Sequence, residues 1–216
     1  MSAVSGKSIT ECFAFASRVG VEIEGLMNTL SDKLVASLKQ ASLPCKVADK
    51  PKWDSQDDPE GWICKDSAFS IPLKGADKGP TERYVRVQVS VAGEGIAIPK
   101  NEGPVLHVSF WEAPYDFEDQ VATYFPMSET DDMPFSVVSQ RQLLWIEKNE
   151  PKWNEQKWTF SLRLTELNSA DDLQNYVIDP VLALLNGAHA KDVLPDVWFE
   201  TVLIRYPDKQ QLLPLA

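Results

Sequence analysis

The clearest pattern in the sequence is an apolar stripe along its first forty residues. Apolar side chains recur at three- and four-residue steps from Val19 to Leu38. This spacing places them on one face of an α-helix, and Ser8 and Glu11 have the spacing of a capping box at a helix start. We therefore expect a helix from about Ser8 to about Gln40 that packs on a sheet, with Cys12 among its core residues.

Two later segments alternate apolar and polar residues with the period of a β-strand. Valine occupies every second position in residues 84–91, and Leu106, Val108 and Phe110 alternate with polar or aromatic residues in 105–112. Alternation of this kind is typical of a strand with one buried face. Further strands are predicted at 62–65, 69–73, 143–147, 158–167 and 197–206. Residues 41–61, rich in proline and acids, are expected to form a loop-rich connection.

A second helix is predicted near residues 170–186. Ser169 can cap its start, Asp171 and Asp172 suit its first turn, and Pro180 should kink or split it. The order of helix, strands, helix and strand indicates an α+β fold, with a mostly antiparallel sheet of about five to seven strands. We expect residues 1–216 to form a single domain in which both helices cover the valine face of the sheet.

Composition and charge narrow the function classes. The chain is 44% hydrophobic and 25% charged, as in globular proteins, and its 32 acidic against 21 basic residues give a net charge of −11. That charge disfavours general nucleic-acid binding and contact with anionic lipid. No apolar stretch is long enough to cross a membrane, and three cysteines without a CxxC pair fit a reducing compartment. We therefore expect a cytoplasmic protein.

Familiar catalytic and metal-binding motifs are missing from the sequence. Gly6-Lys7-Ser8 lacks the earlier glycine of a phosphate-binding loop, and the two histidines, His107 and His189, have no partner at metal-ligand spacing. No nucleophile signature is present either. We expect a non-enzymatic protein with no cofactor and no metal at a histidine or cysteine site, while a Mg²⁺ site built from carboxylates alone stays open.

The charge distribution is most uneven between Lys100 and Arg141. These forty residues hold eight acids and no Lys or Arg, interleaved with aromatic rings, and 112–135 is expected to be an acidic aromatic loop region. Carboxylates steer a basic partner and rings anchor it, although the rings could equally be core residues. The predicted partner-binding residues are Glu112, Asp116, Glu118, Asp119, Asp131, Asp132, Trp111 and Tyr115.

A different hypothesis comes from the polar face of the predicted sheet. The face opposite the valines would carry Tyr84, Arg86, His107 and Arg163. These side chains could bind a small anion or carry out a reaction on it. The alternative is that this is an ordinary solvated sheet face. The first hypothesis is an acidic protein-binding module, such as an inhibitor, an immunity-type protein or an adaptor, with a basic protein as partner. A homo-oligomer is left open.

Overall fold

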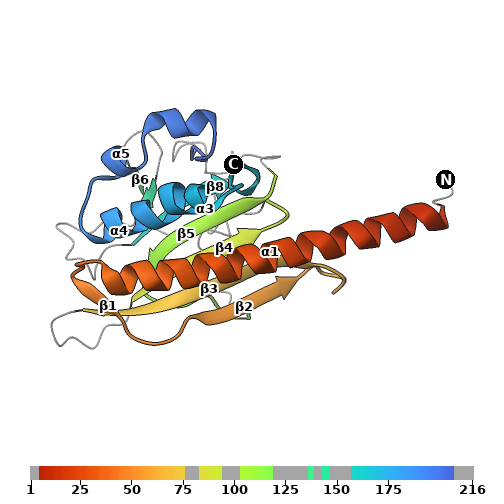
Figure 1. Cartoon of the computed structure of the whole chain (residues 1–216), viewed down its shortest axis with the longest axis horizontal. Coiled ribbons are helices and arrows are strands. Elements are labelled where there is room, and N and C mark those ends of the chain that lie inside the picture. Colours follow the sequence, from red (N-terminus) through yellow and green to blue (C-terminus); the bar gives the residue numbers. More distant parts are fainter. Residues whose placement is uncertain are drawn as a thin grey trace, which may run out of the picture.

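One antiparallel sheet forms the centre of the protein, and a long helix, α1 (Gly6–Gln40), crosses one of its faces (Figure 1). The computed structural model describes residues 5–75, 83–93, 103–118 and 157–206, together with two short strands at 136–138 and 143–145. The strands are β1 (Cys45–Val47), β2 (Lys52–Asp57), β3 (Cys64–Gly75), β4 (Arg83–Ser90), β5 (Val105–Trp111), β6 (Ser136–Val138), β7 (Leu143–Trp145) and β8 (Trp158–Arg163).

The strand order is β1-β3-β4-β5-β8-β7-β6, and β2 pairs with β3 beyond the end of β1. Every pair of strands in the described residues is antiparallel. Since antiparallel neighbours are joined by short connections, the long central strands β3, β4 and β5 follow one another directly in the sequence. The predicted α+β class with a mostly antiparallel sheet is confirmed, and the described residues contain eight strands.

The second helical segment lies beside α1 on the same face of the sheet (Figure 1). It consists of α3 (Ala170–Leu173), a π-turn η4 (Gln174–Ile178) and α4 (Asp179–Leu185), and Ser169 caps its start as predicted. Pro180 lies in the first turn of α4, directly after the π-turn. A proline is tolerated in a first helical turn although it lacks an N–H, so the helix continues to Leu185. Three short helical segments complete this region: η3 (Leu164–Glu166), α5 (Ala190–Val193) and η5 (Asp196–Glu200).

The main hydrophobic core lies between this helical layer and the sheet. Val85, Val87 and Val89 of β4 are fully buried there, and Val91 is partly buried. The helices contribute the residues at their predicted apolar spacing, namely Met27, Leu30, Leu34, Leu38, Leu173, Val177 and Val181. Leu106, Val108 and Phe110 of β5 point into the same core, which confirms the face assigned to them from the alternation.

Helix α1 is longer than the sheet it covers. It begins at Gly6, where the Ser5 side chain accepts a hydrogen bond from the Ser8 N–H, so it starts earlier than the predicted Ser8. Its fully buried residues begin only at Met27, and its first half projects past the sheet (Figure 1). We call residues 6–22 the overhang. A segment of this length rises about 25 Å, or nearly five helical turns.

Two segments differ from their sequence-based expectation. Residues 41–61 contain β1 and β2. β1 is only three residues long, with Cys45 buried and Val47 packed against the core, and β2 is an edge strand whose polar side chains leave no apolar alternation. Residues 197–206 do not form a strand beyond one bridge, Leu203 with Leu162, and they begin in η5. Their apolar residues Val202, Leu203 and Ile204 are buried as an irregular segment, which the composition alone cannot distinguish from a strand.

Among the residues that the structure describes, no helix combines the length and the apolar character needed to cross a bilayer.

Candidate functional site

The predicted acidic docking residues are only partly brought together. Asp116 and Glu118 are exposed, Glu112 is half-exposed in ion pairs, and Asp119, Asp131 and Asp132 lie outside the described residues. The rings of Trp111 and Tyr115 are buried. In this structure, the two predicted anchors therefore pack inside the protein, which is the alternative that the sequence left open for them.

Glu112 is bound by two cations. Its Oε2 lies 2.7 Å from Lys157 Nζ and 3.3 Å from Arg83 Nη1. Partial burial raises the pKa of the Glu112 carboxyl, but the hydrogen bonds and positive charges of Lys157 and Arg83 outweigh burial and lower it overall. Because these two cations neutralise the carboxylate, it attracts a separate basic partner only weakly.

The predicted anion-binding face is a buried polar layer. The register places polar side chains in rows across four strands: Ser70, Arg86, Ser109 and Thr159 in one, and Gln88, His107 and Ser161 in the next. Tyr84, Arg86 and His107 are thus on one face, as predicted. All seven side chains of the two rows are fully buried, so this is not a solvated sheet face.

Arg86 is enclosed by aromatic rings of this chain. Its guanidinium carbon lies 4.2 Å from the ring centre of Tyr115 and 5.5 Å from that of Trp111. Burial lowers the pKa of Arg86 and raises the pKa of Tyr115, and the contact between the two groups partly offsets both shifts. The Tyr115 N–H donates to Ser70 Oγ at 2.8 Å, which fixes residues 113–118 over this face. The cation is therefore paired with the protein's own rings.

His107 and Arg163 also use their polar atoms within the chain. A hydrogen bond of 2.7 Å joins His107 Nδ1 to Ser161 Oγ, and another of 2.6 Å joins that hydroxyl to the Tyr206 hydroxyl. Arg163 Nη1 donates to the carbonyls of Thr201 and Leu203, at 2.8 and 3.1 Å. These contacts hold the segment after η5 against β8. Arg163 therefore does not converge with Arg86 on a common ligand position.

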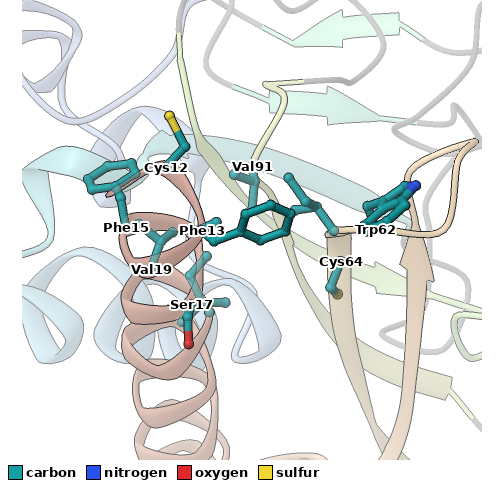
Figure 2. Close-up of a pocket in the computed structure, with 12 residues that line it drawn as sticks. Cys12, Phe13, Phe15, Ser17, Val19, Trp62, Cys64 and Val91 are labelled. Carbon is teal, nitrogen blue, oxygen red and sulfur yellow. The ribbon is translucent and has the colours of Figure 1, made fainter. Parts of the chain in front are cut away.

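An open apolar site lies on the other side of the sheet, where the overhang passes the β2–β3 hairpin (Figure 2). It is a cavity of about 610 Å³ whose described lining residues carry no formal charge. We call it the apolar groove; it is lined by Cys12, Phe13, Phe15, Ala16, Ser17, Val19, Gly20, Ile23, Trp62, Ile63, Cys64 and Val91.

The walls of the apolar groove carry large exposed rings. Phe15 is 63% exposed and Trp62 is 73% exposed, and Phe13 lies between them with its ring centre 6.3 Å from that of Trp62. In Figure 2 Phe13 reaches from the helix toward Trp62, while Phe15 points along the other side of α1. Monomeric proteins rarely leave such contiguous apolar surface in water.

The hairpin turn is built to hold Trp62 and Ile63 in place. Asp58 Oδ1 accepts hydrogen bonds from the backbone N–H groups of Trp62 and Ile63, at 2.7 and 2.6 Å. The bond from Ile63 is the main reason that the pKa of Asp58 is lowered, so this carboxylate is charged at neutral pH. Gly61 supplies the left-handed conformation of the turn, with φ near +70°.

A second cavity, of about 550 Å³, continues the apolar groove along α1. It shares Gly20, Ile23, Cys64 and Val91 with the first and reaches Asn28. Because Cys12 and Asn28 are sixteen residues apart on one helix, the two cavities together follow α1 for about 24 Å.

The segments that form the walls of the apolar groove carry more acids than bases. Residues 6–25 of α1 and residues 57–63 of the hairpin turn contain six acids and two bases. The acids are Glu11, Glu22, Glu24, Asp57, Asp58 and Glu60, and of the two bases, Lys7 is 3.7 Å from Glu11. The lining of the groove is therefore uncharged, while these two segments, which we call its rim, are net negative.

This site is not among the sequence-based predictions, and Cys12, expected in the core, is exposed. A signal was nevertheless present in the lengths of the elements. A helix of 35 residues rises about 52 Å, but a strand of eight residues, such as β4, spans only about 26 Å. Part of the helix therefore had no strand to cover.

Within the described ranges, no group of three or more His, Cys, Asp or Glu side chains is arranged to hold a metal ion. No protein-family model matches this chain, and comparisons with the curated proteins and with the solved structures also find no match.

Proposed function

We propose that this chain is a non-enzymatic protein-binding module that captures a basic partner protein in the apolar groove. The observation that carries the proposal is an uncharged groove with exposed rings and a negative rim. Rings supply most of the binding free energy when a partner buries them, and the rim accelerates the encounter with a positively charged surface.

The basic partner is the one expected from the sequence, but the proposed docking surface is the apolar groove instead of the acidic aromatic loop region. In residues 111–118, Trp111 and Tyr115 contact Arg86, and Glu112 contacts Lys157 and Arg83. In the apolar groove, by contrast, Phe15 and Trp62 are exposed, and the hairpin turn that carries Trp62 also carries the exposed acids Asp57 and Glu60. The groove therefore offers both properties that docking on a basic protein requires.

Photo-crosslinking tests the proposal. A benzoylphenylalanine placed at position 15 should capture a basic protein in a lysate of the cells that make this chain. The same group at position 21 is the control, because Val21 is 68% exposed on α1 and does not line the groove.

The captured protein is then purified and its affinity measured. Trp62→Ser should weaken binding by about tenfold or more, since truncating an aromatic anchor costs about 2 kcal/mol. Val21→Ser should leave the affinity unchanged. Equal capture at positions 15 and 21, or a purified partner indifferent to Trp62→Ser, would contradict the proposal.

A further inference from the structure

We infer that the part of the partner that fills the apolar groove is an amphipathic α-helix with a basic outer face. This inference rests on the proposed function and names the occupant of the same site. Three properties of the groove lead to it: the backbone of its walls, its length and small residues, and its charge.

The strand that forms a wall of the apolar groove leaves no backbone edge for an extended peptide, and the edge strand β2 lines only the second cavity, through Trp53 and Ser55. Along α1 every backbone group in the interior of the helix is bonded to its own turn. Across the groove, β3 is paired on both sides, with β2 through Cys64–Ser70 and with β4 through Asp66–Leu73. An extended segment would therefore bury its own N–H and C=O groups without partners, at a cost of several kcal/mol, whereas a helix satisfies its own.

The dimensions of the groove also suit a helix. The apolar groove and the second cavity together are about 24 Å long, which corresponds to about sixteen helical residues, or four to five turns. Ala16, Ser17 and Gly20 present small side chains along the α1 wall, and no atom lies within 4 Å of the position that a Cβ of Gly20 would occupy. This open space allows a second helix to approach α1 closely, with Phe15 on one side and Trp62 on the other as anchors.

Charge selects the kind of helix. The net charge of residues 6–25 and 57–63 is negative, so lysines or arginines on the outer face of the docked helix would meet carboxylates at the rim. A second copy of this chain would instead bring the same negative rim and a net charge of −11. Like charges oppose that pairing, which makes a basic partner the better occupant.

The test uses synthetic peptides and the full-length protein. The first probe is an eighteen-residue peptide with leucines on one helical face and lysines on the other. Three matched peptides change one property each: a scrambled order that spreads the leucines around the helix, two central prolines that prevent a helix, and glutamates in place of the lysines.

We expect the leucine–lysine peptide to bind and each matched peptide to bind at least about tenfold more weakly, a difference of about 1.4 kcal/mol. A hydrocarbon-stapled version should bind more tightly, because its helix is formed in advance. Phe15→Ser and Trp62→Ser should each weaken binding by about tenfold, while Val21→Ser should not change it. Cys12 and Cys64 line the groove, so the bound peptide should also slow their reaction with a maleimide.

Four results would overturn the inference. The proline peptide binding as well as the helical one would indicate an extended occupant. Sedimentation of a dimer that Trp62→Ser dissociates would indicate a second copy, and tight binding to phosphatidylcholine vesicles would indicate a lipid surface. Maleimide resistance of Cys12 and Cys64 in the free protein would indicate that this chain fills its own groove.

The two proposals fail in different ways. If a crosslinked partner depends on Trp62 but tolerates prolines in its docking segment, the proposed function stands and the helical occupant is wrong. If the designed helix binds but no partner is captured at position 15, the groove accepts a helix and the proposed function is wrong.

Discussion

The three cysteines of this chain occupy three different environments. Cys12 and Cys64 line the apolar groove, whereas Cys45 is buried in the core, and burial raises its pKa from the ordinary 9.0 to about 11. Burial is also the first cause of the raised pKa of Cys64, with Asp57 and Asp66 adding to it. Cysteine thiolates react and thiols do not, so exposure and pKa together determine reactivity.

At pH 8 we expect Cys12 to be labelled first, Cys64 more slowly, and Cys45 only after unfolding. Mass spectrometry of partly labelled protein measures this order. Because the pKa of Cys45 is higher in the folded protein than its ordinary value, its stabilising contribution is complete below pH 9 and is lost as the pH rises toward 11. Rapid labelling of Cys45 in the native state would contradict its buried position.

Arg86 is the largest charged side chain buried in the described residues, and it fills the space between two rings. Arg86→Ala should lower the free energy of unfolding by about 3 kcal/mol, because it leaves a cavity and removes the cation–π contacts. Arg86→Met should cost less than half of that, since it restores volume without a buried charge. Denaturant titrations compare the two. Equal losses would show that the charge, and not the volume, is what stabilises this layer.

At the scale of elements, the overhang is a helix held by few tertiary contacts. Residues 6–22 lie almost entirely in solvent. Gly20 within the overhang and Gly25 just after it weaken this part of α1, since interior glycine costs about 1 kcal/mol relative to alanine. No atom lies within 4 Å of a Cβ at either glycine. Amide exchange should therefore be faster in the overhang than in residues 27–40, which pack on the sheet.

Gly20→Ala and Gly25→Ala should each slow exchange in the overhang, by about fivefold for 1 kcal/mol. Only Gly20 lines the groove, so only Gly20→Ala should also weaken the leucine–lysine peptide, because its methyl group narrows the approach to α1. Hydrogen exchange read by mass spectrometry and peptide titration measure the two effects. A loss of affinity in both variants would mean that stiffening the helix, and not filling the groove, impairs binding.

The whole molecule carries a net charge of −11, so acids at either of two surfaces, the hairpin turn or residues 112–118, could attract a basic partner. Asp57→Asn with Glu60→Gln should slow association with the basic partner and flatten its dependence on salt, because exposed charges act on the encounter rate. The matched pair Asp116→Asn with Glu118→Gln removes the same charge from the surface predicted by sequence. Stopped-flow association at several salt concentrations separates them. If only the second pair slows association, docking occurs at residues 112–132.

The periodic parts of this protein follow from local residue order alone. The stripe from Val19 to Leu38 and the valines of β4 predicted the main helix, the central strand and the α+β class, because period and burial are linked within a single element. Ser169 likewise marked the start of the second helix through a local hydrogen bond. These features depend on neighbours a few residues apart.

What the surfaces of those elements contact depends on how the whole chain packs. That Arg86 lies against Tyr115, or that Phe13 lies against Trp62, depends on residues 29 and 49 positions apart, which no local pattern connects. Residues 113–118 and Tyr206 lie against the polar sheet face, and the overhang is exposed because the sheet ends before the helix does. Burial is a property of the assembled molecule, so the candidate site became visible only where the helix passes the edge of the sheet.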